Sequence, residues 1–404
     1  NYITRHQVLL QRMYRSNIWA KKSVAIPANY SVKGWRNLSD DDFEVEEKRL
    51  NIKALTADAL TWSFLFGGSM AVFIVDDGLA PSEPLNLNNI KPNSFKRIII
   101  LDRWKVTSGE VESNPLSDNY LEPTHYRINI GNTTASYHPS RCHRFITNPL
   151  PIDEARHEQY WGVSTLEIIY RQLISDDVFL SSISNMMKKA TMDIMGIPNL
   201  SHMIKSGQEE AVKKRIRLAQ STMSNLNSWV KDAGTNGQNA ETYERITQQF
   251  SGFDAMDIQS QNRIAAAAEI PATIFLGRSE AGLNADGSGS LNIFNDRLMT
   301  IREINIDPFL TKIDTIIAKT LNKKVPTYKW ENPFPMTKKE EAEIRNLDAD
   351  VVVKMQTMQV ADGVIANKLF EFGIIDEDEK KTVEDDFKLE PFDIEDHPET
   401  NEEN

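Results

Sequence analysis

Apolar positions in the second half of the chain recur at helical spacing on both sides of a stretch rich in glycine. Over residues 254–270 they predict a helix of about four turns that ends near Ile270. Pro271 stops it, because proline lacks an amide proton and restricts the residue before it. Over 291–321 the apolar residues occupy too many positions to form one narrow stripe along a helix. We therefore expect a long, largely buried helix there, bent at Pro308.

The stretch between these two helices, 277–290, carries four glycines together with several serines. Backbone of this composition has too little apolar mass to pack, so the pattern predicts a mobile loop. It contains neither GxxxxGK(S/T) nor GxGxxG ahead of a helix, so the sequence does not indicate a phosphate-binding loop. A hinge or a pore loop fits the composition better.

The first 160 residues alternate helical and strand patterns. A helical pattern covers 4–20, a loop follows, and the polar residues 39–42 cap a second helix rich in Glu and Lys. Runs rich in β-branched and aromatic residues then predict four short strands, at 69–78, 97–104, 125–130 and 142–150. The first domain is therefore expected to be α+β.

From Trp161 onwards, about thirty residues without proline or internal glycine predict a helix on the order of 45 Å long, ending at 196–198. A polar helix over 207–232, a turn and a strand within 242–250 are expected next. The segment 191–253 is therefore predicted to be a small subdomain inserted between two helices.

Beyond Leu321 the pattern predicts a short strand, a turn and two helices separated near Gly363. Thr337 and Glu340 have the spacing of a capping box at the start of the first of these helices. The formal net charge of -12 is concentrated at the end, because 376–404 holds fourteen Asp or Glu against three Lys, a net of -11. Such a run favours a solvated acidic tail, and the functional alternative is a surface that repels nucleic acid or docks a basic partner.

Composition excludes several classes of protein. With 404 residues, 40% of them hydrophobic and 26% charged, the chain is long enough for two or three packed units. A single cysteine, Cys142, excludes an internal disulfide framework and a cysteine-rich zinc site. The uncharged run 59–75 is at the short limit for a membrane span and contains Gly67 and Gly68, so it favours a helix turning into a buried strand. We expect no membrane segment, and no signal peptide is recognisable.

Catalytic chemistry finds little support in the residues. None of the seven histidines forms an HExxH motif, and only His138-Pro-Ser140 resembles the H-x-(S/T) motif, of which a two-histidine phosphodiesterase needs two copies. No nucleophile with a nearby base can be assembled. We predict no catalytic residue, no metal and no cofactor.

A basic cluster lies in the polar helix at Lys213, Lys214, Arg215 and Arg217. Cations at this spacing can contact DNA phosphates. Glu209 and Glu210 sit one turn away, however, so a solvated helix face with local ion pairs is the simpler interpretation.

Four blocks, in this order, resemble the portal proteins of tailed bacteriophages, in the branch whose domain is also labelled as similar to an anti-CBASS protein. They are HPSRCHRF (138–145), QYWGVSTLE (159–167), IPATIFLGRSEAGLNADGSGSLNIFNDRL (270–298) and ENPFPMTKKEEAEI (331–344). The resemblance implies a ring, usually of twelve subunits, at one vertex of the capsid. Double-stranded DNA is pumped through such a ring during packaging and released through it later.

The resemblance also implies the portal architecture of an α/β wing, long stem helices, a small α/β clip, a tunnel loop and helix, and C-terminal helices on the crown side. The parts map onto this sequence as wing 1–165, stem helix 166–190, clip 191–253, second stem helix 254–276, tunnel loop 277–290, tunnel helix 291–321, C-terminal wing or crown helices 322–375 and acidic tail 376–404.

Two sets of site residues follow from the resemblance. The DNA-facing candidates of the tunnel loop are Arg278, Ser279, Glu280, Asn284, Asp286 and Ser288, and the candidates for partner docking in the clip are Lys205, Lys213, Lys214, Arg215 and Arg217. The mixed charge of the loop suits a DNA channel, because a bore lined with lysine would hold phosphates and stall movement.

The implied partners are further copies of the chain, double-stranded DNA, the terminase large subunit, a head–tail adaptor and the major capsid or scaffolding protein. The implied location is the portal vertex of the virion, with the host cytoplasm as the place of assembly. The alternatives from other classes are a cyclic-nucleotide phosphodiesterase and a cytosolic adaptor that forms no ring.

Overall fold

The computed structural model describes residues 2–117, 120–130, 133–188, 191–226, 233, 240–247, 252–278, 288–334, 338–358 and 362–372. It divides into two compact units, Asn1–Pro333 and Phe334–Asn404. The fold is α+β, as the sequence pattern predicts. Among the helices that the structure describes, none combines the length and apolar character that a membrane span requires.

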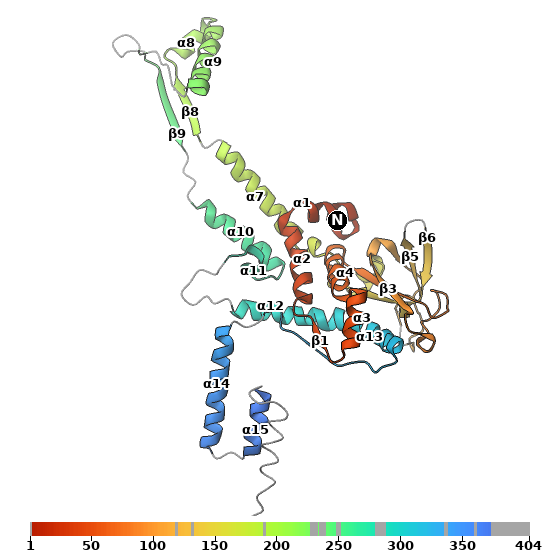
Figure 1. Cartoon of the computed structure of the whole chain (residues 1–404). Helices are drawn as coiled ribbons and strands as arrows, with labels where there is room; N and C mark the ends of the chain where they lie inside the picture. The colour runs from red at the N-terminus through yellow and green to blue at the C-terminus, as the bar shows by residue number, and fades with distance from the viewer. Residues whose placement is uncertain are drawn as a thin grey trace, which may run out of the picture. The chain divides into compact units, whose positions relative to one another are not determined.

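Four helices and a short 3₁₀ turn open the first unit (Figure 1), namely η1 (Ile3–Arg5), α1 (Gln7–Ser16), α2 (Ile18–Val32), α3 (Asp41–Leu50) and α4 (Ile52–Phe66). The expected single helix over 4–20 is wrong, because Asn17 interrupts it and its side chain caps α2 by accepting from the backbone N–H groups of Trp19 and Ala20. The expected loop after residue 20 is also wrong. Helix α2 continues through Pro27, since its small buried residues pack against α4.

Two antiparallel sheets form the centre of the first unit. In the first sheet β2 (Ser69–Val75) lies between β3 (Phe95–Asp102) and β7 (Cys142–Phe145). In the second sheet β5 (Tyr126–Ile130) lies between β4 (Val106–Ser108) and β6 (Thr133–Tyr137). All four strands predicted in this region are confirmed, and a shared apolar cluster joins the sheets through Met70, Val72, Leu101, Val106, Ile128 and Trp161. The remaining 3₁₀ turns are η2 (Leu87–Asn89), η3 (Arg103–Lys105) and η4 (Pro139–Arg141).

The next helices are α5 (Ile152–His157), α6 (Thr165–Ile168) and α7 (Tyr170–Lys188). The expected continuation of this helix to 196–198 is wrong, because Thr191–Gly196 forms strand β8 and pairs along its whole length with β9 (Thr242–Thr247). Apolar Met192 and Ile194 alternate with polar residues, a period that suits a strand. The strand expected within 242–250 is thus confirmed.

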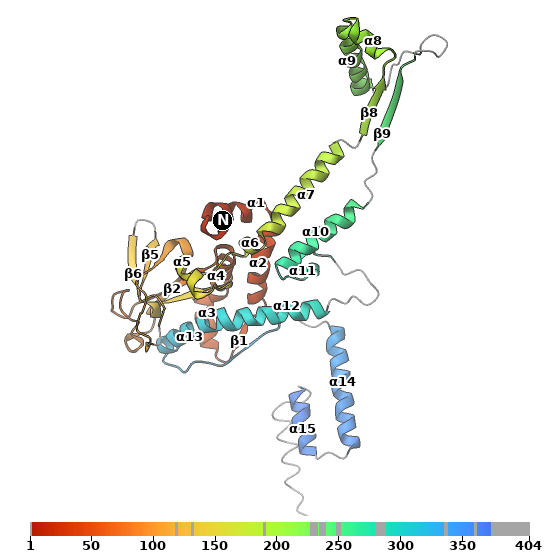
Figure 2. The same cartoon turned by 180° about the vertical axis from the view of Figure 1, so that it is seen from behind.

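Helices α8 (Leu200–Lys205) and α9 (Glu209–Leu226) lie between these two strands in the chain, and α8 packs against α9. Helix α10 (Phe253–Ala267) then runs alongside α7 in both views of the molecule (Figures 1 and 2). The Ser260 hydroxyl of α10 donates to the buried Asp176 carboxylate of α7 at 2.7 Å, so the two helices are joined by a polar contact as well as by packing.

A short helix, α11 (Ala272–Leu276), follows α10, and α12 (Ser288–Ile301) begins the long helix predicted over 291–321. That helix has one interruption, the π-helical segment η5 (Arg302–Ile306), after which α13 (Asp307–Leu321) continues. The interruption comes just before Pro308, the second residue of α13, whose missing N–H leaves one hydrogen bond of the helix unmade.

Strand β1 (Arg36–Leu38) pairs antiparallel with β10 (Tyr328–Trp330), so the end of α2 and the segment after α13 meet in one small sheet. The second unit contains α14 (Lys338–Thr357) and α15 (Asp362–Glu371), which pack against each other. Two C-terminal helices are therefore confirmed. The predicted capping box cannot be compared, since Thr337 lies outside the described residues.

Arg302, the first residue of the π segment, is fully buried and binds backbone carbonyls from two distant segments. Its Nε donates to Ser31 O at 2.8 Å, and its two terminal nitrogens donate to the carbonyls of Lys33, Gly34 and Glu331. The guanidinium also lies over the Trp330 ring at 4.4 Å. Burial lowers the pKa of Arg302 to about 10, so the group stays charged at neutral pH.

A second buried arginine, Arg36 on β1, binds two carboxylates. It donates to Asp314 of α13 at 2.6 and 2.8 Å and to Glu47 of α3 at 3.0 Å. This bidentate geometry compensates the burial of the charges. Arg36 and Arg302 together attach the long helix to the N-terminal helices.

Replacing Arg302 with methionine is expected to lower the free energy of unfolding of the first unit by about 3 kcal/mol or more. Each hydrogen bond to a charged group contributes about 1.5–3 kcal/mol, and one buried and three partly buried carbonyls would lose this donor. Lysine should restore little of the loss, because one amine cannot replace the planar fork of donors. The measurement is urea unfolding followed by tryptophan fluorescence, with exposed Glu303→Ala as the control that should change the free energy by less than about 0.5 kcal/mol.

Candidate functional site

The basic cluster predicted in the clip lies on α9, and one member is engaged inside the subdomain. Arg215 is half-buried and binds the buried Glu241 at the start of β9, with its Nε donating to Glu241 Oε1 at 2.8 Å. Arg215 therefore ties α9 to the strand pair of β8 and β9, while its side chain stays 23% exposed.

The other clip candidates are exposed. Lys213 pairs with Glu210 one turn earlier at 3.0 Å, as the simpler interpretation of the cluster expected. For the part of the chain that the structure describes, no ion pair joins Lys205, Lys214 or Arg217 to a carboxylate. These three cations on α8 and α9 are thus left to solvent or to a partner.

The predicted tunnel loop is described only at its two ends. Arg278 is exposed and follows Gly277, whose positive φ of 70° ends α11. Ser288 is the first residue of α12. The candidates Ser279, Glu280, Asn284 and Asp286 lie outside the described residues.

The helices that flank this segment are held in place by contacts with other helices of the first unit. On the α11 side, Lys22 of α2 donates from Nζ to Phe275 O at 2.6 Å, and Trp19 stacks on Phe275 at 5.5 Å. On the α12 side, Arg297 donates to Ala268 O and Glu269 O at 2.7 and 2.8 Å, which ties α12 to the end of α10. The segment between Arg278 and Ser288 therefore joins two fixed points.

Arg297 and Arg302 were missed by the sequence reasoning, although a signal was present. They are arginines within a helix whose inward positions are mostly apolar, and an arginine at such a position needs buried acceptors. Which carbonyls would accept could not be foreseen, because they come from segments far apart in the chain.

The π segment is also fastened to the first sheet. The His143 ring of β7 donates from Nε2 to Asn305 O at 3.1 Å, and the Asn305 side chain accepts from Ile146 N at 3.0 Å. Burial lowers the pKa of His143 to about 3, so the ring is neutral at physiological pH. The ring therefore acts as a neutral hydrogen-bond donor and does not change its charge near pH 7.

The motif His138-Pro-Ser140 caps a turn. His138 Nδ1 lies 2.9 Å from Ser140 Oγ and accepts from Ser140 N at 3.2 Å, while Ser140 Oγ accepts from Leu85 N at 2.8 Å. His125 lies opposite, with ring centroids 5.8 Å apart, but it begins His-Tyr-Arg and supplies no second H-x-(S/T) motif. Burial, and then the neighbouring His125, lower the pKa of His138.

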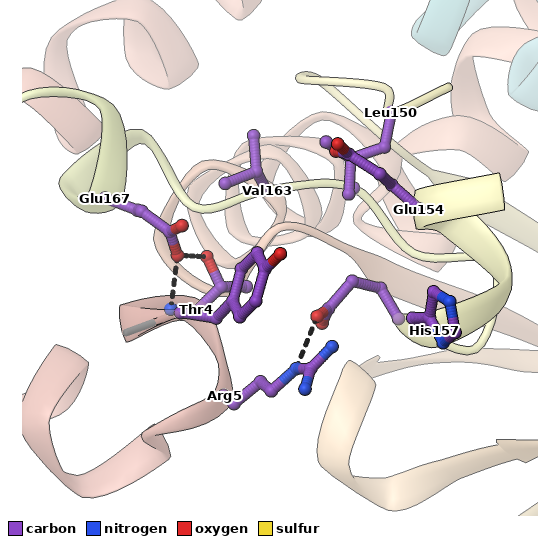
Figure 3. Close-up of a pocket in the computed structure, with 10 residues that line it drawn as sticks. Thr4, Arg5, Leu150, Glu154, His157, Val163 and Glu167 are labelled. Carbon is purple, nitrogen blue, oxygen red and sulfur yellow. Dashed lines mark hydrogen bonds and ion pairs between the residues drawn. The ribbon is translucent and has the colours of Figure 1, made fainter. Parts of the chain in front are cut away.

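A small pocket of about 90 Å³ lies beside the first turn of the chain (Figure 3). Thr4 donates from its N–H and its hydroxyl to Glu167, at 2.7 and 2.5 Å. Glu158 accepts from Arg5 at 2.6 Å and from the buried Arg103 at 2.7 Å. The pocket's buried charge is therefore paired, and these contacts fasten the start of the chain to the turn ahead of α7.

Within the residues that the structure describes, no three His, Cys, Asp or Glu side chains gather as a metal-binding group. The single cysteine, Cys142, is buried, which raises the pKa of its thiol to about 12 and leaves it protonated and unreactive. What the arrangement does offer is a segment held between two anchored helices and an exposed basic surface on α8 and α9.

Comparison with known proteins identifies relatives along nearly the whole chain. An anti-CBASS protein Acb1 of Sphingomonas paeninsulae is 28% identical over 361 residues, which are 87% of this chain and 57% of that protein. The chain thus spans little more than half the length of that relative. An uncharacterized protein of Haemophilus influenzae is 28% identical over 378 residues, covering 90% of this chain and 83% of the relative.

Solved structures of particle necks share the fold. The neck of a native gene transfer agent (GTA) particle, computed with C12 symmetry, has a TM-score of 0.51 at 13% identity and covers 94% of this chain and 93% of its own. The neck of an empty GTA particle, computed with C6 symmetry, has a TM-score of 0.52 at 12% identity, covering 91% and 93%. A family model described as phage portal protein matches residues 9–354. The chain therefore belongs to the phage portal protein family.

Proposed function

We propose that this chain is the subunit of a portal ring at one capsid vertex, through which double-stranded DNA enters during packaging and leaves during ejection. The observation that carries the proposal is the match of the portal family over 9–354, together with a neck-like fold over 94% of the chain. The twelvefold and sixfold symmetry of those necks supports a closed ring. A ring of twelve subunits at the portal vertex of a virion, assembled in the host cytoplasm, is the form that we propose.

The proposed parts follow the family architecture. Helices α7 and α10 would be the two stem helices, the β8–β9 hairpin with α8 and α9 the clip, and α12 with α13 the tunnel helix. The body formed by α1–α4 and the two three-stranded sheets would be the wing. Contacts such as Ser260 with Asp176 and Arg302 with the α2 carbonyls would keep these parts in register around the channel.

The loop 277–290 is proposed to face the DNA. Its support is the anchoring of both ends by Lys22 and Arg297, because a segment held at fixed points can contact a moving duplex while the helices stay in place. Its mixed charge would limit phosphate binding, which otherwise grows with each cation that neutralises a phosphate.

The exposed cations Lys205, Lys214 and Arg217 are proposed to dock the terminase large subunit during packaging and the head–tail adaptor afterwards. Unpaired surface charges of one sign steer a complementary partner and fix its register. Arg215 is proposed to position α9 for that contact through Glu241. The capsid or scaffolding protein is expected to contact the wing.

A structural role without catalysis is the proposal, since portal and neck proteins are structural components of particles. The anti-CBASS name of two relatives keeps an enzyme as the second candidate. That name belongs to proteins of which this chain matches 57%, so it need not refer to the matched part. The capping role of His138 also argues against phosphodiesterase chemistry.

Removing residues 279–287 and joining the ends with a short linker should leave ring assembly intact and impair DNA packaging or retention, because the anchored helices would keep their places. Native mass spectrometry and electron microscopy would measure assembly, and nuclease-protected DNA in assembled heads would measure packaging. A Gly/Ser linker of the original length is the matched control, because it removes the side chains of the loop but keeps its length. Normal packaging by the shortened rings would contradict the tunnel-loop assignment.

Reversing two exposed clip charges, Lys214→Glu with Arg217→Glu, should give rings of normal size but heads that lack DNA or tails. Charge repulsion at a docking surface slows association more than it disturbs the fold of an exposed helix. Electron microscopy of particles made with the variant would count full, empty and tailless heads. Exposed Lys21→Glu on α2 serves as the control; equal loss in both variants would argue against the clip as the docking surface.

A further inference from the structure

A cleft of about 330 Å³ opens where the π segment and the start of α13 meet strand β7. Its lining includes Arg144, Lys312, Ile304, Pro308 and Glu122. The tunnel-loop and clip assignments do not use these residues. The cleft therefore needs an explanation of its own.

The charge in the cleft is incompletely balanced. Lys312 donates from Nζ to Cys142 O at 3.0 Å, and burial lowers its pKa. Arg144 donates to Tyr160 O at 3.2 Å and lies 3.8 Å from the carboxylate of Glu122, whose side chain is 53% exposed. Glu122 is the one acid among the lining residues. Two cations thus share one half-exposed carboxylate, which pairs with Arg144 at 3.8 Å, in a chain whose net charge is -12.

The buried groups of the cleft add no further charge. The ring of His143 is neutral, because burial lowers its pKa to about 3. The thiol of Cys142 is protonated, because burial raises its pKa to about 12. The cleft therefore remains cationic through the neutral pH range.

Apolar side chains at the mouth of the cleft and beyond it are exposed to solvent. Ile304 is 63% exposed, and Ile293 on α12 is 74% exposed. The two isoleucines are eleven residues apart, close to three helical turns, so they share one face of the long helix. Exposed Pro308 continues the apolar surface beside the cleft.

This combination favours a protein side chain over nucleic acid. A DNA phosphate would neutralise Lys312 and Arg144 but would leave the isoleucines beside a hydrated backbone. A carboxylate carried on an apolar protein surface satisfies both, because the acid binds the cations while the surface around it covers the isoleucines.

We propose that the cleft is part of the interface between neighbouring copies of this chain, and that it receives an Asp or Glu side chain of the adjacent copy. The inference rests on the proposed ring, in which each subunit presents one surface to a different surface of its neighbour. The same neighbour covers Ile293 and Ile304. The cleft thus contributes to ring closure, separately from the loop and the clip.

Two pairs of matched variants test the interface. Ile304→Lys adds a like charge to the cleft, with Val45→Lys on α3 as its control, because both side chains are 63% exposed. Lys312→Met removes one cation, with exposed Lys319→Met on the same helix as its control. Light scattering and native mass spectrometry would give the protein concentration at which half of the chains are assembled. Both cleft variants should raise it about ten-fold or more, and the controls should change it less than two-fold.

Cross-linking identifies the partner group in the unaltered protein. A carbodiimide couples a carboxylate to a lysine amine without a spacer, and rings mixed from ¹⁴N- and ¹⁵N-labelled chains distinguish links between chains from links within one. Lys312 is expected in peptide pairs of mixed isotope, joined to an Asp or Glu of another copy. Links from Lys312 only to Glu122 of the same chain would overturn the proposal.

The outcomes separate this inference from the portal assignment. Normal rings from both cleft variants would overturn the interface and leave the portal function standing. A dimer in place of a ring, lost on Ile304→Lys, would support the interface and count against the ring. Normal assembly with weakened DNA retention would show that the cleft faces DNA, and the inference would be wrong. An unaltered chain that stays monomeric at every concentration tested would contradict both.

Discussion

The arrangement of the first unit depends on the binding of backbone carbonyls by one buried arginine. Arg302 donates to backbone carbonyls at the end of α2 and after α13. An uncompensated buried carbonyl is costly, so these segments and the long helix can fold together only in one relative position. The Arg36 pair with Asp314 repeats this constraint about three turns further along the long helix. The proposed wing and tunnel helix therefore behave as one body.

Local sequence patterns correctly predicted the elements whose conformation is set by neighbouring residues. Strand β2 is a largely buried apolar run, and α10 ends shortly before Pro271. The predictions failed for segments whose conformation depends on contacts with residues far away in the sequence. Residues 191–196 read as helix until β9 pairs with them, and α2 passes through Pro27 because α4 packs along it. Sequence periodicity carries no information about a partner fifty residues away.

The candidate site shows the same division. A glycine-rich stretch and a basic cluster are visible as composition, so the loop and α9 could be singled out from the sequence. Their energetic roles could not. Arg215 looked equivalent to Lys214 until its carboxylate partner, Glu241, was placed beside it, and the cleft around Lys312 joins residues that no motif connects. Ion pairs between segments far apart in the chain distinguish structural cations from available ones.

The π segment has a consequence for how the chain tolerates change in length. A π turn contains one residue more than an α-helical turn, so losing a single residue from Arg302–Ile306 would let α12 and α13 join as one uninterrupted α-helix. The four remaining residues would advance by about 100° each, nearly the same total angle as five π-helical residues at roughly 4.4 residues per turn, so Asp314 would still face Arg36. Related sequences should therefore tolerate the loss of one residue within the π segment, whereas a deletion inside α13 ahead of Asp314 would turn that carboxylate by about 100° away from Arg36.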